Sequence, residues 1–80
     1  MSMDLQRSIG LALRQYRTRA GASQHELAAR SGVHSTYISN IERGQRNPGL
    51  GTLQRLAEAL AVPASELVRA AEEIGARDGC

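Results

Sequence analysis

Apolar residues in this chain recur at the three- and four-residue spacing of an α-helix, and glycine or proline repeatedly interrupts that pattern. No stretch alternates apolar and polar residues as a β-strand does, so the chain is expected to fold as several short helices. Its 80 residues are enough for one compact domain, and because they include no Trp or Phe, the core must be aliphatic. The sequence therefore predicts an all-α fold, a five-helix bundle in one domain over residues 1–80.

Capping and stop signals set the expected helix bounds, which are about 4–20, 23–31, 35–43, 50–60 and 63–73. Ser23 and Glu26 predict a capping box, because each side chain can accept the backbone N–H of the other residue. Gly32 allows a tight turn between the second and third helices. His34 takes the N-cap position of the third helix, where Ser, Thr or Asp caps better, which hints at another use. Gly10 costs the first helix about 1 kcal/mol relative to Ala.

Charge is divided unevenly along the chain. Residues 1–56 hold eight of the ten arginines and three of the eight acidic residues, and the remainder is acidic. This division predicts that the first two thirds contact a polyanion, although ordinary solvated helix faces are an alternative. No segment reads as a membrane span or a signal peptide, so we expect a cytoplasmic protein with no membrane partner. Cys80, the single cysteine, excludes an internal disulfide and is interpreted as a passive tail.

The second and third predicted helices, joined at Gly32, have the spacing of a helix-turn-helix. Small Ala28 stands where the two helix axes approach, and four apolar residues supply the contacts between them: Leu27, Val33, Ile38 and Ile41. The second helix of such a unit is held outward, where it can enter the major groove of DNA. The residues left on its outer face carry hydrogen-bonding or cationic groups: Ser35, Thr36, Tyr37, Asn40 and Arg43.

At these residues the sequence resembles the Cro and phage-repressor (XRE-type) helix-turn-helix family. The resemblance covers about residues 9–67 and consists of "LRQYR", "SQHELAARSGV", "STYISNIERGQRNP" and "LQRLAEALAV" followed by "SEL". Within the family the chain is most similar to the controller proteins of restriction-modification systems, which share "TYIS", "IERG" and "RN". The resemblance implies a lambda-repressor-like domain that binds a double-stranded DNA operator and regulates transcription. The last helix and the tail, residues 64–80, are expected to serve dimerisation.

The residues expected to contact DNA are Gln24, His34, Ser35, Thr36, Tyr37, Asn40, Arg43, Arg46 and Asn47, and the resemblance implies all of them except His34. Base-facing positions of the family are matched by Ser35, Thr36 and Asn40, and a phosphate contact is matched by Gln24. Positions that contact phosphates or, for Arg46, base edges are matched by Tyr37, Arg43, Arg46 and Asn47. Arg17 and Glu42 match a structural ion pair. The chain departs from the family at His34, at Gly49 and at Ser35, which lacks a long side chain. Ordinary roles in helix ends, turns or the core rim are the alternative for each residue.

A single recognition helix reads only about four or five base pairs, too few to select one genomic site. We therefore expect a homodimer on a palindromic operator, with the two helices about 34 Å apart. The apolar residues of the acidic last helix are candidates for the dimer interface: Leu67, Val68, Ala71 and Ile74. Some of them must also cover the core of the domain.

Other functions fit the sequence less well. His25 and Glu26 resemble the start of a zinc-protease motif, but Ala29 stands where the second histidine is needed. Tyr16 and Tyr37 are the only aromatic residues, which leaves no stacking platform for single-stranded nucleic acid. We therefore expect no enzymatic activity, no metal, no cofactor and no small-molecule ligand. The remaining alternative is a protein-interaction module, antitoxin-like or coactivator-like, on the same fold.

Overall fold

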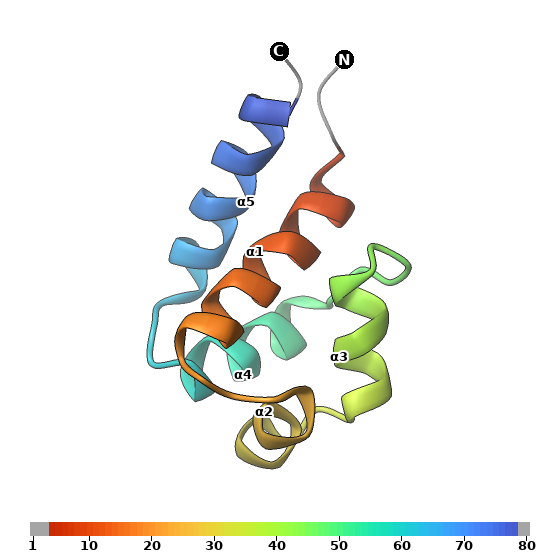
Figure 1. The fold of residues 1–80 in the computed structure, drawn as a ribbon, viewed down its shortest axis with the longest axis vertical. Coiled ribbons are helices and arrows are strands. Elements are labelled where there is room, and N and C mark those ends of the chain that lie inside the picture. The colour runs from red at the N-terminus through yellow and green to blue at the C-terminus, as the bar shows by residue number, and fades with distance from the viewer. Residues whose placement is uncertain (1–3, 79–80) are drawn as a thin grey trace.

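The computed structural model describes residues 4–78. It contains five α-helices in chain order (Figure 1): α1 (Leu5–Arg19), α2 (Gln24–Ser31), α3 (Ser35–Glu42), α4 (Leu50–Ala59) and α5 (Ala64–Asp78). No strand occurs among these described residues. The predicted all-α, five-helix fold is confirmed. Cys80 lies outside the described residues.

Helix α1 is the central element of the molecule. It lies between α5 on one side and α3 on the other, while α2 and α4 close the end of the bundle away from the two termini (Figure 1). The molecule measures 36 × 22 × 22 Å along its principal axes. Helix α2 packs against α3 and α4, and α3 also packs against α1. Both helices of the helix-turn-helix pair are therefore supported by the rest of the bundle.

Two aliphatic clusters make up the core, and α1 and α4 contribute to both. The first joins them to α5 and consists of Ile9, Ala12, Leu53, Ala57, Leu67, Ala71 and Ile74. The second joins them to α2 and α3 and consists of Leu13, Leu27, Val33, Ile38, Ile41 and Leu56. The residues expected between α2 and α3 are therefore buried, as predicted.

The predicted helix starts are present with their caps. Ser23 Oγ accepts the Glu26 N–H at 3.0 Å, and Glu26 Oε1 accepts the Ser23 N–H at 2.8 Å, which completes the capping box. Gly32 ends α2 in the left-handed conformation, with φ of 74°. His34 does cap α3, since its Nδ1 accepts the N–H of Thr36 at 3.0 Å. Gly49 offers α4 no side-chain cap.

Some helix bounds differ from the prediction. Helix α5 extends to Asp78 rather than about Glu73, because Ile74 is buried in the first cluster and gives the additional turns a packing partner. Helices α3 and α4 each end one residue earlier than expected. Leu50, expected with the apolar positions of α4, is 86% exposed at the first residue of that helix.

The packing of α5 corrects part of the predicted dimer interface. Leu67 and Ala71 are fully buried and Ile74 is 8% exposed, all within the first core cluster. These three side chains are not available to a partner chain, because α1 and α4 already cover the apolar face of α5. Only Val68 among the four candidates is half-buried and reaches the surface.

Candidate functional site

The helix-turn-helix pair presents one polar face. On the inner side of α3, Ile38 and Ile41 are fully buried. On the outer side Thr36 is exposed and Ser35 is half-buried, so solvent reaches both residues of the leading turn. The short helix is therefore anchored by its aliphatic side and open along its polar side.

Helices α1 and α3 cross with their backbones in contact at Gly10. A Cβ atom on Gly10 would lie 2.1 Å from the carbonyl oxygen of Ile41 and 3.1 Å from that of Glu42. No other residue fits that crossing without a shift of backbone. The sequence showed Gly10 only as a cost to the helix, since the partner carbonyl lies about thirty residues away in the chain.

A buried ion pair ties three helices together behind the polar face. Arg17 donates from Nε to Glu42 Oε2 at 2.6 Å and from Nη2 to Oε1 at 3.0 Å. The two side chains are 12% and 4% exposed, and the carboxylate raises the pKa of Arg17 above its ordinary value. Arg17 also donates to the Ala22 carbonyl at 2.9 Å, and Gln24 Nε2 donates to Glu42 Oε1 at 3.0 Å. The predicted ion pair is present, and Gln24 is braced against it.

The loop after α3 is folded onto the helix by Tyr37. The Tyr37 hydroxyl donates to the Asn47 carbonyl at 3.2 Å, and the Arg46 guanidinium lies 4.8 Å from the centre of the Tyr37 ring. Arg46 and Asn47 are both exposed beside α3. Three of the predicted site residues are therefore brought together, although they lie up to ten positions apart.

Asn40 of α3 and Arg43, the C-cap residue of that helix, form a second polar pair. Arg43 Nη2 donates to Asn40 Oδ1 at 2.6 Å, which leaves the Asn40 amide N–H groups for another acceptor. The guanidinium keeps further donors of its own, and Arg43 is exposed. Neutral hydrogen-bonding groups thus stand next to a cation on the outer face of one helix.

The start of α1 lies against the same loop, which sequence reasoning missed. Gln6 Nε2 donates to the Gly44 carbonyl at 2.7 Å, and the Cγ atom of Arg7 lies within 3.0 Å of where a Gly44 Cβ would be. The exposed Arg7 is therefore next to the turn that follows Arg43. No local signal could reveal this, because the two segments are 38 residues apart.

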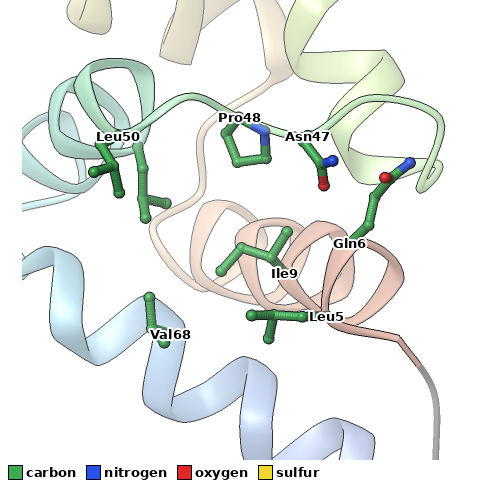
Figure 2. A pocket seen from close by; sticks show the side chains of 8 residues that line it. Leu5, Gln6, Ile9, Asn47, Pro48, Leu50 and Val68 are labelled. Atoms are coloured by element: carbon green, nitrogen blue, oxygen red, sulfur yellow. The ribbon is translucent and has the colours of Figure 1, made fainter.

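An apolar hollow of about 240 Å³ opens beside this loop (Figure 2). The start of α1, the loop, the start of α4 and Val68 of α5 form it; its lining residues are Leu5, Gln6, Ile9, Asn47, Pro48, Leu50, Leu53 and Val68. Leu5 is 52% exposed and Leu50 is 86% exposed. The two large apolar residues that are exposed in the described part of the chain therefore both line this hollow.

Residues 4–78 contain neither a cluster of metal-ligating side chains nor a membrane-spanning helix. No group of three or more His, Cys, Asp or Glu side chains in that range is arranged to hold a metal ion. No helix there combines the length and the apolar character needed to cross a membrane.

Comparison with known proteins places these features in a family. The helix-turn-helix family model matches residues 13–67. The chain is 42% identical to the HTH-type transcriptional regulator y4dJ of Sinorhizobium fredii over 71 aligned residues. This alignment covers 89% of this chain and 92% of that protein. The chain is 45% identical to the control protein C.SmaI of Serratia marcescens over 58 aligned residues, which are 72% of this chain and 69% of that protein. The crystal structure of the restriction-modification controller protein C.AhdI from Aeromonas hydrophila superposes with a TM-score of 0.76 at 42% identity, over 78% of this chain and 94% of that one.

Proposed function

The chain belongs to the helix-turn-helix family of DNA-binding transcription regulators, and on this premise we propose that it acts as a homodimeric controller on a palindromic operator. Such a protein works in the cytoplasm, where the DNA is accessible. The similarity to C.SmaI and C.AhdI, a control protein and a restriction-modification controller, supports the controller role. We place the whole DNA-binding unit in one domain.

The observation that carries the proposal is the two-sided character of α3. Ile38 and Ile41 are fully buried, while Thr36 on the opposite side is exposed and carries a hydroxyl. A helix held in this way can enter the major groove, where hydroxyl and amide groups bond to base edges. We assign base contacts to Ser35, Thr36 and Asn40.

Phosphate contacts are assigned to residues in and around α3. Arg43, Arg46 and Asn47 follow the helix and are exposed, Tyr37 is half-buried within it, and Gln24 is half-buried at the start of α2. We add Arg7, because its position beside Gly44 brings a further cation to the same edge. Contacts of this kind fix the orientation of the protein on the duplex and make binding depend on salt.

The apolar hollow supports a second copy of this chain as the partner. A two-fold dimer needs a surface that complements itself, and a projecting leucine beside an apolar hollow meets that requirement. Leu50 projects in this way and Val68 lines the hollow from α5. Asn47 and Pro48 also line it, so an interface there lies next to the loop that follows the recognition helix.

Selection of bound duplexes from a random oligonucleotide pool tests the proposal. We expect an enriched palindrome with half-sites separated by about one helical turn, followed by a mobility shift that weakens steeply with salt. Failure to enrich any duplex sequence would contradict DNA-binding regulation and favour a protein-interaction module. Enrichment of a single half-site without symmetry would contradict the proposed dimer and leave the proposed DNA binding intact.

A further inference from the structure

His34 caps α3 at the end that leads into the DNA groove in the proposed function. Its backbone is extended, and its Nδ1 lies 3.0 Å from the backbone nitrogen of Thr36, whose N–H it accepts. A ring nitrogen accepts a hydrogen bond only when it carries no proton, and in the neutral ring the proton is then on the other nitrogen. The cap therefore holds neutral His34 as the Nε2–H tautomer.

The Nε2–H group is a spare donor on the surface. His34 is exposed, and within residues 4–78 the only hydrogen bond of its side chain is the one that Nδ1 accepts from the Thr36 N–H. The acceptor nitrogen of the ring is already used by the cap, so the ring offers its surroundings a donor and no acceptor. Thr36, also exposed, stands two residues further along the same leading turn.

We propose that His34 is a DNA-contact residue that donates its Nε2–H to an acceptor on the operator. The inference rests on the proposed DNA-binding function and adds the direction of the hydrogen bond. Acceptors available to it are the phosphate oxygens and, in the major groove, the N7 and O6 atoms of purines and the O4 atom of thymine. Aspartate would also cap α3, but its negative charge would face the duplex. Histidine combines a cap with a neutral donor.

Variants separate the cap from the donor. His34→Ser replaces the ring with a hydroxyl that caps α3 at least as well, so we expect a Tm no lower than that of the native chain. We expect the Kd for the operator to rise about five- to tenfold, the value of one hydrogen bond. His34→Ala removes both groups, so we expect the same loss of affinity together with a lower Tm. A His34→Ser protein that binds the operator as tightly as the native chain overturns the proposal.

Histidine NMR reports the tautomer directly. In the free protein, when the ring is neutral, we expect long-range proton–nitrogen correlations of the Nε2–H tautomer for His34. Exposed His25, whose ring caps no helix, is the reference in the same spectrum. Addition of operator should protect the Nε2 proton of His34 from exchange. An Nδ1–H tautomer, or an Nε2 proton that exchanges as fast in the complex as in the free protein, overturns the proposal.

Modified operators identify the acceptor. A neutral methylphosphonate at the contacted linkage, or a base change at the contacted position, should abolish the difference in Kd between native and His34→Ser proteins. The first result identifies a phosphate and the second a base edge. A difference that survives every single modification overturns the proposal. Loss of all duplex binding by the native protein contradicts the proposed function instead, so the two failures are distinguishable.

Discussion

At Gly10 local helix preference and tertiary packing make opposite demands. Helix propensity alone favours Gly10→Ala by about 1 kcal/mol. The added Cβ would lie 2.1 Å from the Ile41 carbonyl oxygen, so the two backbones must separate. We expect Gly10→Ala to lower the free energy of unfolding by about 1–3 kcal/mol, as overpacking does. Chemical denaturation measures it, with Gly51→Ala, an exposed glycine of α4 with open space around it, as the control. An increase in stability for Gly10→Ala would contradict the close crossing.

Thr36 and Asn40 carry the residue-level test of base recognition. We expect Thr36→Ala or Asn40→Ala to weaken operator binding by about 1–3 kcal/mol, because a base-edge hydrogen bond is lost while the core is untouched. Mobility-shift titration on the operator and on a random duplex measures the change. Equal loss on both duplexes would assign these side chains to general backbone contact.

Among the helices, α1, α2 and α3 depend on the Arg17–Glu42 pair. Arg17→Ala leaves a carboxylate that is 4% exposed without its cation, and we expect a loss of about 3–5 kcal/mol in the free energy of unfolding. The matched control is Arg69→Ala, since Arg69 pairs with Glu66 and Glu73 at the surface, where water screens the charges and such pairs contribute little to stability. Similar melting temperatures for the two variants would refute the structural role of the pair.

Helices α1 and α5 are joined by the Tyr16 hydroxyl, which donates to Glu66 Oε2 at 2.7 Å. The hydrogen bonds from Arg69 and then from Tyr16 lower the pKa of Glu66 from 4.5 to about 2. Because this pKa is depressed in the folded state, the stabilisation it reflects is present above pH 4.5 and is lost as the pH falls towards 2. We expect Arg69→Ala to raise the pKa of Glu66 more than Tyr16→Phe does, measured by carboxyl NMR titration. The opposite order would show that Tyr16 is the stronger partner.

At the scale of the whole molecule, the proposed homodimer forms through the apolar hollow beside α4. Leu50 is 86% exposed, so Leu50→Glu is expected to leave the melting temperature of the domain nearly unchanged while a charge enters the proposed dimer surface. Light scattering after size exclusion should show a dimer for the native chain and a monomer for the variant. Arg77→Glu, also exposed but on the last turn of α5, is the control. A dimer that persists in Leu50→Glu would place the interface elsewhere.

Local signals in the sequence were enough for most of the helices, whereas the DNA-contact residues were assigned through the family resemblance and stay a prediction. Ser23, Glu26 and Gly32 act on neighbouring residues, so the bounds of α2 and the turn to α3 were predictable. The pairing of Arg17 with Glu42 was predictable only through the family resemblance. Contacts between distant segments were not predictable, because no periodicity reports them. Gly10 against Ile41 and Gln6 against Gly44 are examples. For α5 the sequence predicted that some apolar residues cover the core, and the structure shows that these are Leu67, Ala71 and Ile74.

Helix α5 packs on α1 and α4 and makes no substantial contact with α2 or α3 within the described part of the chain. Substitutions on its solvent side therefore do not alter how the recognition helix is held. In the proposed function, residues on the solvent side of α5 can therefore change while each copy of the chain continues to bind the same DNA half-site.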